Sequence, residues 1–335
     1  MLRLMDTPED TIAGSALYLR IMFMGMVPNM VYNVGSAILR AMGDSKRPLY
    51  FLIVACLSNV VLDLVFVLVF KMGIAGVAIA SILAQAISAV MVVMSLSAES
   101  MEYRFRFRQM RFEGDILSRT IRIGLPAGFQ SIMYSLSNML IQASVNRFGT
   151  DTVASWVVLG KVDGINWMIL GALGIASMTF VGQNYGAGRL DRIQKSLKLS
   201  LLIGVSISIV FGGALLLFGW PLFGLFTSDD TVLAMSMQLL WYFAPFYWLF
   251  VPIEIISGAL RGMGDTLIPT IITATGICVF RVAWIYTVVP LHNSMFTVSL
   301  SYPISWVLTA IAFAIYYMIA RKKLIANAPK PRTAE

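Results

Sequence analysis

Long apolar segments separated by short polar ones run along the whole chain, and this pattern predicts membrane-spanning helices. A spanning helix needs about 20 predominantly apolar residues. Nine segments meet that length: about 11–34, 48–70, 73–97, 120–145, 152–181, 196–220, 232–257, 268–290 and 294–320. Transmembrane β-strands alternate apolar and polar positions over about ten residues, so these unbroken runs favour helices. We therefore expect an all-α polytopic membrane protein.

The amino-acid composition points to the same class. Of the 335 residues, 58% are hydrophobic and 13% are charged, whereas a soluble domain carries about 25% charged residues. The two cysteines lie in apolar segments without metal-ligand spacing, and there is one histidine, so we expect no metal site and no cofactor. The sequence contains neither His-Glu-x-x-His nor Gly-x-Ser-x-Gly, which argues against an enzyme.

The net charge of +8 is a topology signal. Nineteen of the 25 Lys and Arg lie in one set of alternating loops and in the C-terminal tail, and three lie in the opposite loops. Cytoplasmic loops carry the excess of Lys and Arg. We therefore expect a multi-pass protein of the bacterial cytoplasmic membrane with a cytoplasmic C-terminus and an external N-terminus. Its expected partners are the lipid bilayer and small organic substrates, with no nucleic acid and no obligate protein partner.

Two similar segments indicate an internal repeat. Residues 36–48 and 257–269 are identical at seven of thirteen positions at an offset of 221, and both contain Leu-Arg-x-Met-Gly-Asp. In each, a helix is expected to end at the membrane surface, Gly to turn the chain and Pro to open the next helix.

Each repeated turn also carries an Arg and an Asp four residues apart. In the first interpretation the turn is purely structural, with the Arg held by phosphate headgroups and helix C-terminal carbonyls. In the second, the turn is a gate that pairs Arg40 with Asp44, or Arg261 with Asp265, in one transport state only.

The offset of 221 also predicts three spans ahead of residue 1, because the spans between about 120 and 220 have no counterpart in the first repeat. We expect residues 1–100 to be the remnant of an N-terminal lobe with three spans. Residues 101–119 are expected to form a basic cytoplasmic linker, and residues 120–335 a C-terminal lobe with six spans and a basic tail. Two homologous bundles around a midplane site are a common transporter plan.

Several motifs carry a resemblance to a known family. Phe180-Val-Gly-Gln-Asn-Tyr-Gly-Ala-Gly-Arg-Leu-Asp-Arg192 resembles the end of the eighth span of multidrug and toxic compound extrusion (MATE) transporters. The two Leu-Arg-x-Met-Gly-Asp turns resemble the segments after its fourth and tenth spans. Gly124-Leu-Pro126 and Ser301-Tyr-Pro-Ile-Ser-Trp306 resemble its seventh and twelfth spans. The similarity runs from the fourth span onward.

The resemblance implies two homologous helix bundles of the MATE type in a V shape, here three spans of the first lobe plus six of the second. It also implies alternating access and the export of cationic or amphipathic drugs, driven by H⁺ or Na⁺. Several family members carry a coupling aspartate in the first span, which would precede this sequence. Sodium-coupled members of another branch carry a seventh-span glutamate, and the matching residues 129–134 contain no acid.

Ionisable side chains within spans are costly and are candidates for function. Lys161 and Asp163 are two residues apart, so they do not share a helix face. They either take part in an acid–base step of transport or join structural ion pairs between helices. Arg281 needs a partner, and Glu254 on the preceding span is chemically suitable, although it lies nearer the cytoplasmic end. A structural role is the first interpretation of Arg281.

A polar stripe marks the span at 120–145. Its members are spaced 4, 3 and 4 residues apart, which places them on one helix face: Ser131, Ser135, Asn138 and Gln142, bordered by Gln130 and Tyr134. Such a face either packs against another helix or lines a substrate cavity. Aromatic residues could offer cation–π faces to organic cations. The candidates are Trp167, Tyr242, Phe246, Tyr247 and Trp248.

The function predicted first is a secondary antiporter that exports drugs or other small, often cationic, organic compounds in exchange for H⁺ or Na⁺. One alternative is a flippase for lipid-linked oligosaccharides, which would need a strongly cationic cavity. The other is a nonfunctional truncated paralogue.

Overall fold

The computed structural model describes residues 9–98 and 104–326 and divides into two compact units, Met1–Phe112 and Glu113–Glu335. Within the described residues every regular element is helical, which confirms the all-α prediction. The second unit begins inside the segment predicted as a linker, and that segment's residues from Gly114 onward already belong to a helix. Residues 101–103 of the predicted linker and the tail beyond 326 lie outside the described residues.

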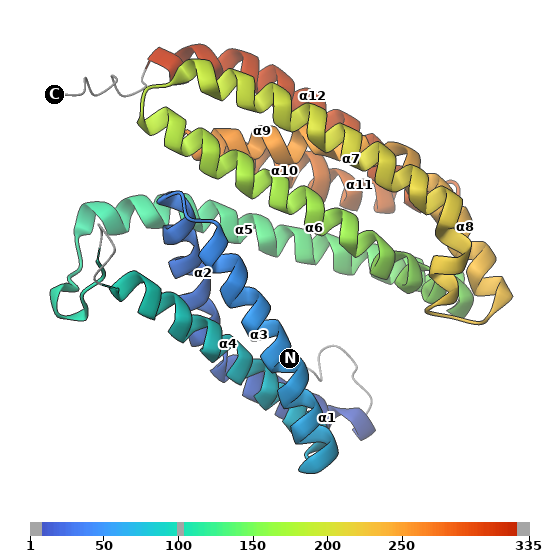
Figure 1. The fold of residues 1–335 in the computed structure, drawn as a ribbon. Helices are drawn as coiled ribbons and strands as arrows, with labels where there is room; N and C mark the ends of the chain where they lie inside the picture. The colour runs from blue at the N-terminus through green and yellow to red at the C-terminus, as the bar shows by residue number, and fades with distance from the viewer. Residues whose placement is uncertain (1–8, 99–103, 327–335) are drawn as a thin grey trace. The chain divides into compact units, whose positions relative to one another are not determined.

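The first unit is a bundle of four long helices (Figure 1): α1 (Glu9–Met24), α2 (Met26–Ala41), α3 (Lys46–Leu64) and α4 (Gly73–Ser97). Shorter turns follow α3 and α4, a π-helical one at Val65–Val69 and a 3-10 one at Phe107–Gln109. α4 packs against the other three. Its contact face is built of small buried residues such as Ala78 and Ala80. Small residues let helix backbones approach closely, and this close packing stabilises helix association in lipid, where the hydrophobic effect does not drive it.

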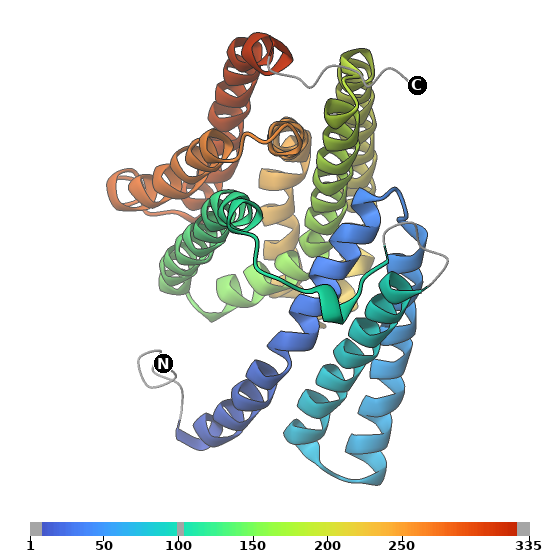
Figure 2. The ribbon, with the colours of Figure 1, turned by 90° about the vertical axis from the view of Figure 1, so that its left-hand side faces the viewer.

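The segment predicted as one span at 11–34 is a bent pair of helices. α1 and α2 meet at an angle of 43°, and the chain between them is visible in Figure 2. Pro28 lacks the N–H that would bond the carbonyl of Met24, so the helical ladder breaks there. Gly25 also lies at the bend, where a Cβ atom would come within 2.6 Å of the Ile82 side chain of α4. The bend therefore follows from a proline and a close helix contact.

The second unit contains the remaining helices. They are α5 (Gly114–Val145), α6 (Thr150–Gly186), α7 (Leu190–Gly224), α8 (Asp230–Phe243), α9 (Val251–Gly262), α10 (Leu267–Thr273), α11 (Phe280–Thr287) and α12 (Met295–Ala326). A 3-10 segment, Ala244–Phe250, joins α8 to α9, and a π-helical segment, Ala274–Val279, joins α10 to α11. Each joined set forms one apolar rod. A 3-10 turn, Asn146–Phe148, follows α5.

Among the described residues, seven of these helical runs are long and apolar enough to cross a membrane, or eight with the bent α1–α2 pair. The prediction had nine. The ninth is α5, which has 32 residues and is long enough to span, but it is less apolar than the other runs. Its polar stripe accounts for that difference. In the second unit α5 packs beside α10 and α11 (Figure 2).

The two repeated turns have the same backbone conformation. Gly43 has φ +92° and Gly264 has φ +90°, a region that glycine enters without steric cost. The N–H of Gly43 donates to the Arg40 carbonyl (3.0 Å), and the next N–H reaches back to Leu39 (2.9 Å). The same two bonds recur after α9. Both are Schellman motifs, and their match supports the repeat predicted from the sequence.

Candidate functional site

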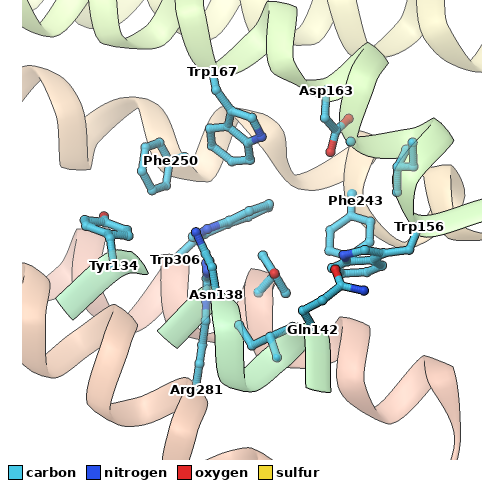
Figure 3. Close-up of a pocket in the computed structure, with 14 residues that line it drawn as sticks. Tyr134, Asn138, Gln142, Trp156, Asp163, Trp167, Phe243, Phe250, Arg281 and Trp306 are labelled. Atoms are coloured by element: carbon cyan, nitrogen blue, oxygen red, sulfur yellow. The ribbon is translucent and has the colours of Figure 1, made fainter. Parts of the chain in front are cut away.

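The second unit encloses a cavity of about 400 Å³ (Figure 3). Four helices, α5, α6, α11 and α12, each contribute one face to the cavity lining. The rest of the lining comes from the end of α8 and from the 3-10 segment Ala244–Phe250 that follows it. The lining residues are Tyr134, Asn138, Ile141, Gln142, Trp156, Leu159, Gly160, Asp163, Trp167, Phe243, Phe250, Arg281, Tyr302 and Trp306. The cavity is thus largely apolar with a few polar groups, as ligand pockets usually are.

The polar stripe of α5 lines the cavity over only part of its length. Tyr134, Asn138 and Gln142 face the cavity. Ser131 and Ser135 instead donate to backbone carbonyls one turn earlier, at 3.2 and 3.0 Å, as serine often does in membrane helices. The cavity interpretation therefore fits Tyr134, Asn138 and Gln142, whereas the bonds of Ser131 and Ser135 within α5 support neither interpretation for these two residues.

Gln130 lies outside the cavity lining. Its Oε1 atom is 3.5 Å from the hydroxyl of Thr270 on α10, so it belongs to the contact between α5 and α10.

Aromatic rings form the cavity wall opposite α5. Trp167 packs edge-to-face on Phe250 (4.9 Å between ring centroids) and on Trp306 (5.7 Å). Tyr302 packs in the same way on Phe243 (5.1 Å) and Trp306 (6.0 Å). Such pairs are the favoured arrangement of aromatic quadrupoles. The rings fix one another and leave a rigid apolar surface toward the cavity.

Of the five aromatic residues proposed as cation–π candidates, only Trp167 lines the cavity. Tyr247 lies behind the wall and is fully buried, whereas Phe246 and Trp248 are exposed. Tyr242 pairs with Phe296, at 5.0 Å between centroids. These four point elsewhere because they follow one another closely around a single helical run.

Five ring residues of the wall were not predicted: Trp156, Phe243, Phe250, Tyr302 and Trp306. Their spacing could have indicated a shared helix face, because Tyr302 and Trp306 are four residues apart and Phe243 and Phe250 are seven apart. Both spacings place side chains on one helix face.

Asp163 is the acidic residue of the cavity lining. It is 8% exposed, and its carboxylate accepts a hydrogen bond from the hydroxyl of the buried Tyr247. Lys161, two residues earlier, is exposed and lies over the ring of Phe226 at 5.2 Å. The prediction that these two side chains do not face each other is confirmed, and only Asp163 reaches the cavity. The described residues hold no cluster of three or more His, Cys, Asp or Glu suited to a metal ion.

Arg281 is the cationic residue of the lining and is 4% exposed. Its Nε atom donates to the Ser305 hydroxyl at 3.0 Å, and its Cζ atom lies 3.8 Å above the ring of Tyr302. Glu254, the suggested partner, instead packs against α6, where a Cβ atom on Gly174 would lie 2.8 Å from its Oε2 atom. The α9 carboxylate therefore does not neutralise this arginine.

The gate candidates have other partners in this conformation. Asp44 pairs with Arg47 at 3.2 Å and accepts from the backbone N–H groups of Lys46 and Arg47. Its carboxylate therefore binds two backbone N–H groups in the first turn of α3.

In the second turn, Arg261 donates from Nη2 to the Ser257 hydroxyl at 2.7 Å. Asp265 accepts a hydrogen bond from the hydroxyl of Tyr316 on α12. This contact ties the α9–α10 turn to the last helix, and the pairing of Arg261 with Asp265 is not the one observed.

The first unit has a cavity of its own, of about 380 Å³, rich in amide side chains. Its lining includes Asn29, Asn33, Asn59, Ser81 and Gln85. Residues 29, 81 and 85 correspond, at the repeat offset of 221, to residues 250, 302 and 306 of the second cavity. The two cavities therefore occupy repeat-related places within their units.

Apolar helical rods long enough to cross a membrane surround a cavity with a buried acid and a buried arginine, an arrangement expected of a multi-pass membrane transporter. The MatE family model matches residues 1–65 and 126–287. The chain belongs to the MatE family. Members of this family are transporters rather than enzymes, and the resemblance found in the motifs is confirmed.

Curated relatives and solved structures agree with this assignment. "Probable multidrug resistance protein YoeA" of Bacillus subtilis (strain 168) is 29% identical over 340 residues, covering 96% of this chain and 72% of YoeA. "Probable multidrug resistance protein YpnP" of the same organism is 30% identical over 327 residues, with the same shares. The bent form of the Vibrio cholerae MATE transporter VcmN superimposes with a TM-score of 0.86 at 18% identity, covering 98% of this chain and 74% of VcmN.

Proposed function

We propose that this protein is a secondary transporter that exports small aromatic organic compounds, drugs among them, in exchange for H⁺ or Na⁺. The observation that carries the proposal is the cavity of the second unit, with its rigid aromatic wall and one buried carboxylate. The names of YoeA and YpnP, as multidrug resistance proteins, support the substrate class.

Asp163 is the proposed coupling residue. A carboxylate inside a spanning helix is costly and is kept where it serves transport. Because Asp163 lines the same cavity as the aromatic wall, a bound cation and a bound substrate would compete for the space around it. Such competition biases the populations of inward- and outward-facing states, since each ligand favours the state it binds better.

The proposed location is the bacterial cytoplasmic membrane, with the C-terminus in the cytoplasm. The bias of Lys and Arg toward one set of loops supports this orientation. Export then means movement away from the side that carries the basic loops.

The flippase alternative is less well supported by the cavity. A lipid-linked oligosaccharide carries a pyrophosphate and several sugars, whereas the cavity of the second unit has about 400 Å³. Arg281 is the one Lys or Arg of that lining.

Efflux from cells tests the proposal. Cells of a bacterial strain lacking its own drug pumps would express the chain and be loaded with ethidium or fluorescein, two aromatic dyes of opposite charge. We expect energised cells to lose at least one dye faster than cells with an empty vector. A protonophore would stop H⁺-coupled efflux, and sodium-free buffer would stop Na⁺-coupled efflux.

The matched variants are Asp163→Asn and Asp151→Asn, both on α6. Asp151 is exposed at the start of the helix and does not line the cavity. We expect efflux to be lost in the first variant and retained in the second, with equal amounts of protein in the membrane. Unchanged efflux in Asp163→Asn would remove this residue from the coupling proposal, and no efflux of either dye by the parent chain would count against transport.

A further inference from the structure

The geometry points to Arg281 as the binding site for the carboxylate of a small aromatic substrate. This inference rests on the proposed function, because it names the charge class of the compound that the cavity of the second unit accepts. It reverses the expectation of a cationic substrate for this cavity.

The first argument is that the charge of Arg281 is not neutralised by the protein. The guanidinium is 4% exposed, and no carboxylate of the described residues lies within 4.0 Å of it; its contacts are the hydroxyl of Ser305 and the ring of Tyr302. Both partners are neutral. A buried cation without a counter-ion is strongly unfavourable in a spanning bundle, so an anionic ligand at this point would supply the missing charge.

The second argument is the orientation of the guanidinium. Ser305 occupies Nε and the ring of Tyr302 covers one face, which together fix the plane of the group. The two terminal Nη groups have no hydrogen-bond partner among the described residues. In Figure 3, Arg281 extends from its helix to the middle of the cavity, beside Trp306. A fixed planar fork of N–H donors matches the two oxygens of a carboxylate.

The third argument distinguishes the two charges of the cavity. Asp163 already accepts a hydrogen bond from Tyr247, and it lies on the wall opposite the α11 arginine in Figure 3. Each charge thus has only neutral partners in the protein, and the difference between them is that the terminal Nη groups of Arg281 have no hydrogen-bond partner among the described residues. One positive charge in a cavity that also holds an acid suits a ligand of charge −1, such as a carboxylate, better than a phosphate monoester of charge near −2.

The fourth argument concerns the rest of the ligand. Trp167 and Phe250 line the same space that Arg281 enters, and the fully buried Trp306 packs edge-to-face on Trp167 beside them. The volume of about 400 Å³ is at the small end of ligand pockets, which span roughly 300–1,000 Å³. A ligand of one or two fused rings bearing one carboxylate fits both the volume and the chemistry.

Binding of three naphthalene ligands tests the inference on the purified full chain in detergent. 2-Naphthoate is anionic, 2-naphthamide is neutral and 2-naphthylmethylammonium is cationic, while the ring system is the same. Quenching of tryptophan fluorescence reports binding, because Trp156, Trp167 and Trp306 line the cavity. We expect naphthoate to bind about tenfold more tightly than naphthamide, as charge-assisted hydrogen bonds do relative to neutral ones, and the ammonium ligand to bind most weakly.

Two substitutions identify the residue responsible. Arg281→Gln should bring naphthoate and naphthamide to about the same affinity. Lys161→Gln is the matched control, because Lys161 also lies within a spanning helix of the second unit but is exposed and outside the cavity. It should keep the preference for naphthoate. Thermal unfolding and gel filtration show whether each variant is folded, and the ligand order in the parent chain tests the inference even if Arg281→Gln does not fold.

The inference is overturned if the ammonium ligand binds the parent chain more tightly than naphthoate, or if folded Arg281→Gln keeps the preference for naphthoate. Its failure is separable from failure of the proposed function. Ion-coupled dye efflux without a preference for naphthoate would leave transport standing and refute the anion site. Naphthoate binding that depends on Arg281, in a chain that exports neither dye, would support the site and count against transport.

Discussion

The contact between α6 and α9 is among the tightest in the second unit, and it gives a prediction whose size follows from the structure. α9 contains the pair Gly258 and Gly262 four residues apart, which lets two membrane helices approach closely. A Cβ atom on Gly258 would overlap the backbone carbonyl of Gly174 on α6. A Cβ atom on Gly182 would lie 3.2 Å from the carbonyl oxygen of Gly262. We therefore expect Gly258→Ala to destabilise the protein.

The magnitude combines two opposing effects. Overpacking costs about 1–3 kcal/mol, and the upper part of that range applies because the obstacle is backbone, which cannot rotate away. Alanine in a helix interior recovers about 1 kcal/mol relative to glycine. The net loss for Gly258→Ala is then about 1–2 kcal/mol, which corresponds to a drop of a few degrees in the midpoint of thermal unfolding.

Thermal unfolding of the purified protein in detergent measures this change, and Gly171→Ala on α6 is the control. A Cβ atom on Gly171 would meet nothing within 4 Å, so this substitution should raise the midpoint slightly through helix propensity alone. A midpoint for Gly258→Ala at or above that of the parent, or an equal fall in Gly171→Ala, would refute the packing argument.

Two further predictions concern a turn and a buried hydrogen bond. Gly264→Ala should lower the unfolding midpoint, because φ +90° costs a residue with a Cβ about 1–2 kcal/mol. Gly213→Ala, in open space on α7, should not lower it. Tyr247→Phe should slow efflux and destabilise by about 1.5–3 kcal/mol, since Asp163 loses its donor. Tyr242→Phe removes an exposed hydroxyl that bonds Gln238 and should leave both unchanged; equal effects would contradict the role of the buried bond.

Most of the fold could be predicted from the sequence because lipid allows few backbone arrangements. Apolar length alone located most of the helical rods, and the Leu-Arg-x-Met-Gly-Asp repeat located two turns of equal conformation. The bend near Gly25 was not predicted, although Pro28 is visible in the sequence. Counting apolar residues does not detect the backbone hydrogen bond that a proline removes. α5 shows the opposite case. Its polar side chains lower its mean hydropathy, but they do not prevent it from forming a long helix.

The candidate site was harder to predict because it depends on which helix faces meet. Tyr134, Asn138 and Asp163 were identified from polarity within a span, and all three line the cavity. Trp306 was not predicted as a cavity residue, because a tryptophan in an apolar segment is equally compatible with a packing role or with an anchor at the membrane interface. The partner of Arg281 could not be predicted either. The preceding span contains the carboxylate of Glu254, at a different depth in the membrane, and the sequence does not show that Ser305 and Tyr302 lie closer to the arginine.

Comparing the two halves of the internal repeat shows which positions keep the same residue type and which differ. The turn glycines keep the same conformation in both halves, because a side chain there would be strained. Cavity positions instead differ between the halves: Gln85 corresponds to Trp306, and Ser81 to Tyr302. Amides donate and accept hydrogen bonds, whereas rings offer flat apolar surfaces, so the two repeat-related cavities differ in the chemistry of their linings.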